Sequence, residues 1–249
     1  MIKRAGIVFI SISTILFLCV AINAASPIKN KLSSQNHAPV VKIITPKNNS
    51  QFDWNTQLNY SIAVSDEEDG ESRYDEINIK EVLLQVNYIG NESKMQQVLS
   101  KGVQNDAPGL ATIRTSNCFN CHAFNTKAIG PSFYDINKKY PATPANVALM
   151  VKRIREGSSG VWDKTPMPTH TELTKQETQK MVQWILRNSA DSNNSYYTGT
   201  EGAFRIQSVH GLYKKAVYML IASYTDHGTK DDSTHRLKGQ DVVIIRANK

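Results

Sequence analysis

The chain combines two kinds of hydrophobic pattern. Six apolar runs have the length and composition of strands, and they lie at residues 40–45, 58–64, 82–89, 203–207, 216–224 and 242–246. Between the third and the fourth run the period changes, and apolar residues recur at the three-to-four spacing of helices. The pattern therefore predicts the order strands, helices, strands.

Helix-start signals mark the middle segment. Thr143 is followed by Pro144, which is an N-cap before a proline at the first helical position, and Thr174 and Glu177 have the spacing of a capping box. An apolar stripe follows each start, and its members are Val147, Met150, Val151 and Ile154 in the first and Met181, Val182, Ile185 and Leu186 in the second. Two amphipathic helices are therefore expected here.

Neither strand-rich flank is long enough to form a stable sheet alone. About three strands on each side would leave open sheet edges, whereas both flanks together supply about six or seven strands and the roughly 100 residues of an immunoglobulin-like sandwich. We therefore predict an α+β multidomain fold. Residues 37–100 and 200–249 form an antiparallel β-sandwich, and an all-α domain over residues 102–190 is inserted between its halves.

The flanking strands resemble a known family of sandwiches. Residues 36–43 (NHAPVVKI) and 60–70 (YSIAVSDEEDG) are similar to the opening strands of a PKD-type (polycystic-kidney-disease) domain. Residues 216–228 resemble the penultimate strand and its turn, and residues 242–246 resemble the closing strand. The middle of that fold has no match, and the helical segment lies there. The resemblance implies a PKD/Ig-like sandwich.

The first residues predict export. Lys3 and Arg4 precede an apolar run over residues 6–22, and a small-residue stretch around Ala24 completes the pattern of a secretory signal peptide. We expect a signal peptide over residues 1–24, a linker over 25–36 and a mature protein in the periplasm. An uncleaved leader would instead anchor the chain in the membrane, because the run approaches the roughly 20 residues that span a bilayer. Cleavage removes Cys19 and leaves two of the three cysteines.

These two cysteines carry the sharpest chemical signal. In Cys118-Phe119-Asn120-Cys121-His122, two thiols at the end of a short helix can bond the two vinyl groups of a haem, and the imidazole that follows can bind its iron. One alternative is a disulfide or a redox-active thiol pair, which leaves His122 without a role; another is a zinc half-site, which needs further ligands. The motif predicts one covalent haem c, attached through Cys118 and Cys121.

Sequences downstream of this motif extend the prediction. Four stretches follow it in order: GPSF at 130–133, GSSGVW at 157–162, TPMP at 165–168 and WIL at 184–186. Together they resemble the small, single-haem, class I cytochrome c family of bacteria over residues 102–190. The resemblance implies that His122 is the proximal iron ligand and Met167 the sixth ligand, and that Gly130, Pro131 and Trp162 pack against the haem.

The chemistry of Met167 suits this role. A thioether is a soft axial ligand that raises the haem potential when it is paired with His, and Pro166 and Pro168 stiffen the loop on both sides. His170 is the alternative sixth ligand, and Met167 could instead be an exposed loop methionine.

An iron with both axial positions filled has no open site for a substrate, so we expect an electron carrier rather than an enzyme. The chain has a net charge of +7, and residues 110–189 hold eleven Lys and Arg against five Asp and Glu. This charge favours an acidic redox partner, and the basic residues concerned are Lys138, Lys139, Lys152, Arg153, Arg155, Lys164 and Lys175. The resemblance suggests a periplasmic sugar dehydrogenase or a terminal oxidase as that partner, and no nucleic acid is expected.

Two other classes of function stay open. An iron without Met167 could sense a gas or reduce peroxide, and a sandwich that is itself the working part would bind carbohydrate or another surface. The acidic residues between 66 and 76 could bind Ca²⁺ through several carboxylates, but a solvated turn between strands is the favoured explanation, because the spacing of an EF-hand loop is absent. His37, His210, His227 and His235 lack ligand spacing, so we expect ordinary surface residues there.

Overall fold

In the first of two sheets, buried and exposed side chains alternate along the central strand. The computed structural model describes residues 35–102, 106–206 and 216–248, so the expected signal peptide, most of the linker and His210 lie outside the described residues. In β3 (Gln57–Asp66), the side chains of Tyr60, Ile62 and Val64 are buried and the residues between them are not. Strands β1 (Val40–Thr45), β4 (Gly70–Glu71) and β7 (Glu201–Arg205) all pair antiparallel with β3.

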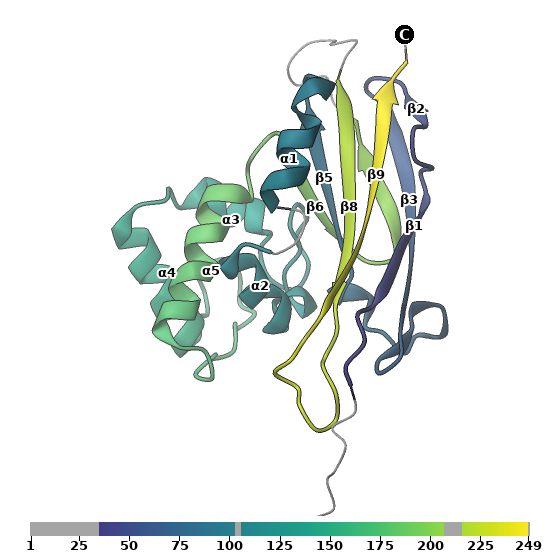
Figure 1. Cartoon of the computed structure of the whole chain (residues 1–249). Helices are drawn as coiled ribbons and strands as arrows, with labels where there is room; N and C mark the ends of the chain where they lie inside the picture. The colour runs from purple at the N-terminus through teal and green to yellow at the C-terminus, as the bar shows by residue number, and fades with distance from the viewer. Residues whose placement is uncertain (1–34, 103–105, 207–215, 249) are drawn as a thin grey trace, which may run out of the picture. The chain divides into compact units, whose positions relative to one another are not determined.

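The second sheet has five strands (Figure 1). Their order is β2 (Gln51–Phe52), β9 (Lys238–Ala247), β8 (Val217–Thr225), β5 (Leu83–Ile89) and β6 (Asn194–Thr198). The short β2 runs parallel to β9, and the other neighbours are antiparallel. Strand β8 is buried at eight of its nine positions. Both faces of this central strand are therefore covered, which explains its nearly continuous apolar sequence.

The two sheets share one hydrophobic core. Ile62 of β3 belongs to the same buried cluster as Leu220 of β8 and Ile245 of β9. On the other face of β8, Met95 and Leu99 of α1 (Met95–Gly102) pack against Met219 and its neighbours (Figure 1). The second sheet is thus covered on one face by the first sheet and on the other face by α1.

The helical segment lies between two neighbouring strands. Strands β5 and β6 pair antiparallel, with Asn87 opposite Asn194, so the chain leaves the sheet after β5 and returns beside it. Strand β3 of the first flank likewise pairs with β7 of the second flank. Strands from both flanks therefore contribute to both sheets.

Some elements lie where the sequence pattern predicts none. These are α1, which replaces strand structure near the end of the stretch 37–100, and the strands β2, β4 and β6. Strand β6 begins within residues 191–195, whose polar composition suggests a spacer. Tertiary packing explains why β6 forms a strand despite its polar composition, because its Tyr196 is buried against the helical segment.

Within the described residues, the inserted segment holds α2 (Pro108–Thr115), α3 (Phe133–Lys139), α4 (Pro144–Glu156) and α5 (Lys175–Asn188). The Thr143 hydroxyl accepts a hydrogen bond from the Asn146 N–H at the start of α4, and Thr174 and Glu177 form a capping box at the start of α5. Both helix starts are the predicted ones. Short 3-10 turns are η1 (Ser72–Tyr74), η2 (Ile79–Glu81), η3 (Glu92–Lys94) and η4 (Cys118–Asn120). None of the described helices has the length and apolar composition needed to cross a bilayer.

Aromatic packing joins the helices to the second sheet. The ring of Tyr196 in β6 stacks on Phe124 with centroids 5.0 Å apart and meets Trp184 of α5 edge-on at 5.3 Å. Leu83 of β5 belongs to the same buried cluster. Large offset and edge-on aromatic contacts of this kind contribute both buried area and orientation, so β6 is part of the helical core as well as of the sheet.

A buried ionic network makes a second connection. The Arg114 side chain of α2 is only 3% exposed and lies 2.6 Å from an oxygen of Asp106. Its guanidinium also donates to the hydroxyl and the carbonyl of Ser223 in β8, at 3.1 Å each, and to the Glu81 carbonyl at 3.3 Å. Lys238 of β9 donates to the other oxygen of Asp106 at 2.7 Å. The network therefore ties α2 to β8 and β9.

Removal of Asp106 should destabilise the protein strongly. Asp106→Ala leaves Arg114 as a buried cation without its carboxylate, which we expect to lower the free energy of unfolding by about 3 kcal/mol. Urea denaturation of the purified full-length protein, followed by far-ultraviolet circular dichroism, measures this. The control is Glu156→Ala, which breaks an exposed pair with Lys152 and should cost less than about 0.5 kcal/mol. Equal effects of the two substitutions would contradict a structural role for the network.

The same network predicts a dependence of stability on acid. Burial alone would raise the pKa of Asp106, but the attraction of Arg114 and Lys238 outweighs it and holds that pKa below its usual value. The stabilisation is therefore complete above the unfolded pKa of about 4 and disappears as pH falls through the lower folded pKa. Between about pH 4 and pH 2, the unfolding free energy of the wild type should fall more steeply than that of Asp106→Asn. Parallel pH profiles would be the contrary result.

Candidate haem site

A tight turn presents the haem motif. Helix α2 ends at Thr115, Asn117 adopts a left-handed conformation with φ of 56°, and η4 follows. The backbone N–H groups of Cys121 and His122 both donate to the Cys118 carbonyl, at 3.2 and 2.9 Å. The expected short helix thus stops before the cysteines, and a 3-10 turn brings Cys118, Cys121 and His122 to the wall of one cavity.

The thiol of Cys118 is not activated for thiol–disulfide exchange. Both Cys118 and Cys121 are free and half-buried. Burial raises the pKa of the Cys118 thiol to about 12, whereas redox-active cysteines depend on a lowered pKa that makes the thiolate available. A buried thiol of this kind is not the activated nucleophile that a redox-active pair requires.

His122 is held so that one ring nitrogen is available. Its Nδ1 lies 2.7 Å from the Pro131 carbonyl, which can only accept, so Nδ1 carries the proton. Burial lowers the pKa of His122 and favours the neutral ring, whose Nε2 then has a free lone pair. The ring also stacks on Phe133 at 5.5 Å. This is the usual arrangement of a metal-binding histidine, oriented by a hydrogen bond from its second nitrogen.

Gly130 leaves room for this imidazole. A Cβ atom at position 130 would lie 2.6 Å from Cε1 of His122, a distance that real Cβ atoms do not show. Gly130 and Pro131 therefore act together, because one makes space for the ring and the other fixes its orientation.

Met167 lies in a loop that is held by backbone hydrogen bonds. The Met167 N–H donates to the Ser158 carbonyl at 2.7 Å, and the Ser158 N–H donates back to Met167 at 3.1 Å. Gly157, with φ of 82°, allows the chain to turn there, since a Cβ would approach the Met167 carbonyl to 3.0 Å. The half-buried Met167 lines the same cavity as the cysteines.

The cavity walls are mainly apolar and come from the haem-motif turn, from α3, α4 and α5, and from the loop between α4 and α5. The lining includes all seven residues expected at the haem and, from α4 and α5, Met150, Ile154, Met181, Val182, Ile185 and Leu186. The periodicity predicts that Met150 and Met181 are core residues, and both are buried, but they also face the cavity. Two thiols, one imidazole with a free nitrogen and one thioether around an apolar space fit the chemistry of a haem c.

Charged and aromatic residues gather beside Trp162, which is 39% exposed. The Lys139 ammonium lies 4.4 Å from the centre of the Trp162 ring, and Tyr140 meets that ring edge-on. Arg153 lines the cavity and donates to the Tyr140 hydroxyl at 2.9 Å. The sequence pattern gives no contact for Tyr140 or for Phe133, although Phe133 closes the GPSF stretch at 130–133.

His170 also lines the cavity, as its place near Met167 suggests. Its Nδ1 is paired with Glu172 at 2.8 Å, and its backbone N–H donates to the Ile154 carbonyl at 3.0 Å. The structure thus brings both candidate sixth ligands to the cavity. Met167 is held there through its backbone, whereas the ring of His170 is also engaged by Glu172.

Comparison with known proteins agrees with this site. The family profile described as "Cytochrome c" matches residues 107–189. Cytochrome c-551 of Pseudomonas aeruginosa is 32% identical over 89 residues, which cover 36% of this chain and 84% of that protein. Cytochrome c-552 of Hydrogenobacter thermophilus is 36% identical over 86 residues, covering 31% and 87%. The crystal structure of Nitrosomonas europaea cytochrome c552 is similar with 32% identity, 31% and 96% coverage and a TM-score of 0.30.

The matched segment contains the whole attachment motif. Residues 107–189 hold Cys118, Cys121 and His122, and this motif attaches one haem covalently. Because the chain covers most of the length of relatives that are more than 30% identical to it, it belongs to the cytochrome c family of haem electron-transfer proteins.

Proposed function

We propose that the protein is a periplasmic electron carrier in which His122 and Met167 bind the haem iron. The observation that carries this proposal is the cavity itself, which both side chains line together with the two cysteines. Nε2 of His122 is free because Nδ1 is engaged by Pro131, and paired backbone hydrogen bonds hold the Met167 loop.

The chain's residues would hold the haem rather than react on it. When bound, the haem supplies an iron that accepts and releases one electron. If His122 and Met167 both held the iron, no ligand position would stay open for oxygen or peroxide, so a gas sensor or a peroxidase is the less supported alternative. The apolar side chains of α4 and α5 that line the cavity would shield a bound haem from water, which, with a Met/His ligand pair, would favour a high reduction potential.

The basic residues fall into two groups in the structure. Lys139 contacts Trp162, and Arg153 lines the haem cavity. Lys152, Arg155 and Lys175 instead line a groove between α4 and α5. We infer that an acidic redox partner docks beside Trp162, where a positive charge lies closest to the cavity.

The two parts of the chain would divide the work. We propose that residues 102–190 are the haem domain and that the sandwich of residues 37–100 and 200–249 carries it, as the resemblance to PKD-type domains suggests. A periplasmic sugar dehydrogenase is the proposed electron donor and a terminal oxidase the alternative partner. Cleavage of residues 1–24 would release the protein into the periplasm, and an uncleaved leader would keep it at the membrane.

Substitution of Met167 tests the axial ligand. Met167→Ala should abolish the weak far-red absorption band that marks a methionine–iron bond in the ferric protein. It should also lower the midpoint potential by on the order of 100 mV, within the roughly 0.8 V range that axial ligands control. Visible spectroscopy and potentiometric titration measure both effects. His170→Ala is the control and should leave the band in place; loss of the band in His170→Ala with its survival in Met167→Ala would assign the role to His170.

Charge reversal tests the docking surface. Lys138→Glu with Lys139→Glu, at adjacent positions at the end of α3, should slow the oxidation of the reduced protein by the anion ferricyanide roughly tenfold at low salt, since steering by local charge is lost. The difference should shrink as salt rises. Lys152→Glu with Lys175→Glu changes the net charge equally but lies in the α4–α5 groove, so its effect should be smaller. Stopped-flow absorbance measures the rates, and equal slowing by both pairs would refute a localised docking surface.

A further inference from the structure

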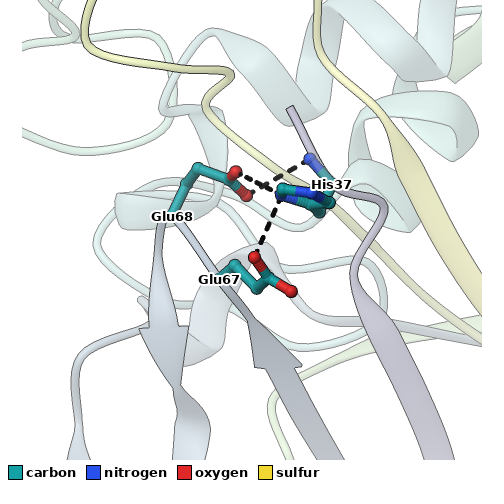
Figure 2. Close-up of side chains that lie close together, drawn as sticks. All are labelled: His37, Glu67 and Glu68. Atoms are coloured by element: carbon teal, nitrogen blue, oxygen red, sulfur yellow. Dashed lines mark hydrogen bonds and ion pairs between the residues drawn. The ribbon is translucent and has the colours of Figure 1, made fainter. Parts of the chain in front are cut away.

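Three potential metal ligands converge at one end of the sandwich (Figure 2). His37 precedes β1, and Glu67 and Glu68 lie in the turn between β3 and β4. Nδ1 of His37 is 3.1 Å from an oxygen of Glu67 and 2.8 Å from an oxygen of Glu68. In the described part of the chain, this is the only group of three His, Cys, Asp or Glu ligand atoms that lie within 4.8 Å of one another.

Strand pairing and local hydrogen bonds fix the three residues. Val40 of β1 pairs with Ser65 of β3, which places the chain before β1 beside the turn after β3. The turn is held by Asp66, whose side chain accepts from the N–H groups of Glu68 and Asp69 at 3.0 and 2.8 Å. The His37 N–H donates to Glu68 at 3.3 Å. The ligand atoms therefore meet without a change in the backbone.

We propose that His37, Glu67 and Glu68 bind one divalent transition-metal ion of the zinc type. One imidazole nitrogen and two carboxylates are a ligand set that Zn²⁺ accepts, with water completing the coordination. The Nδ1 proton that the two carboxylates now accept would leave when the ion binds. Two carboxylates beside the resulting neutral imidazole give a site of net charge −2, which neutralises a divalent ion. Ca²⁺ fits less well, because it takes six to eight oxygen ligands.

The neighbouring histidines do not form such a group. His227 contacts Asp69 through Nδ1 and Glu81 through Nε2, at 3.0 Å each, so its two carboxylates lie against different ring nitrogens. His235 is paired with Asp232 alone. The convergence of two carboxylates on one nitrogen distinguishes His37.

A bound metal would fasten the start of the sandwich. His37 belongs to the segment that enters β1, and Glu67 and Glu68 belong to the next turn of the same sheet. None of the three lines the haem cavity. The proposed ion is therefore separate from the haem site and can be tested without reference to electron transfer.

Calorimetric titration of Zn²⁺ into the untagged, haem-loaded protein tests the proposal. We expect one zinc per chain at a site that His37→Ala weakens at least about tenfold, since one of three protein ligands is lost. His235→Ala is the matched control, because it removes another exposed histidine with one acidic partner, and it should bind zinc as the wild type does. Ca²⁺ titrated in place of zinc should bind more weakly.

Glu67→Gln gives a second test that does not threaten the fold, since the Glu67 side chain is 73% exposed. It should also weaken zinc binding about tenfold, with unchanged haem spectrum and circular dichroism. The proposal is overturned if the wild type binds no zinc, if His37→Ala and Glu67→Gln bind it unchanged, if His235→Ala loses it equally, or if Ca²⁺ binds more tightly.

Discussion

The contacts of the buried Arg114 guanidinium hold the haem site in place against the sandwich. Arg114 lies four residues before Cys118 in the chain, and it is bonded to Ser223 in the central strand β8 as well as to Asp106. A buried cation tolerates little displacement, because each lost partner leaves an unpaired charge in a poorly solvated place. The position of the haem turn is therefore fixed relative to the sheet by an ionic contact, and the stacking of Tyr196 on Phe124 reinforces it.

The haem cavity completes the core of the helical segment. Helices α4 and α5 direct Met150, Ile154, Met181 and Ile185 toward it, and without a large apolar ligand these side chains would line an apolar space exposed to water. Burial against a haem removes that surface from water and stabilises the helices in the same step. The residues that bind the cofactor and the residues that stabilise the fold are thus largely the same set.

The local features of the fold and of the site could be predicted from the sequence, whereas the long-range contacts could not. The strands at residues 40–45, 57–66 and 83–89 lie where the apolar runs predict them, and the capping residues Thr143 and Thr174 begin α4 and α5 as predicted. The haem motif could be recognised because its spacing is local. Strand β6 has a polar composition and is held by Tyr196, and the partners of Arg114 and of His37 lie far along the chain. No spacing rule encodes such contacts, since they follow from strand register and packing.

The place of the helical segment also limits its motion. Asn87 and Asn194 face each other across β5 and β6, so the two covalent connections of the segment leave the sheet side by side. A domain attached by a single linker can swivel to present its haem to partners from many directions, whereas two adjacent attachments together with a buried contact allow almost no rotation. The edge of a bound haem would therefore keep one orientation relative to the sandwich. A surface that binds the sandwich would therefore also determine which direction the haem faces, and so which redox partners can reach it.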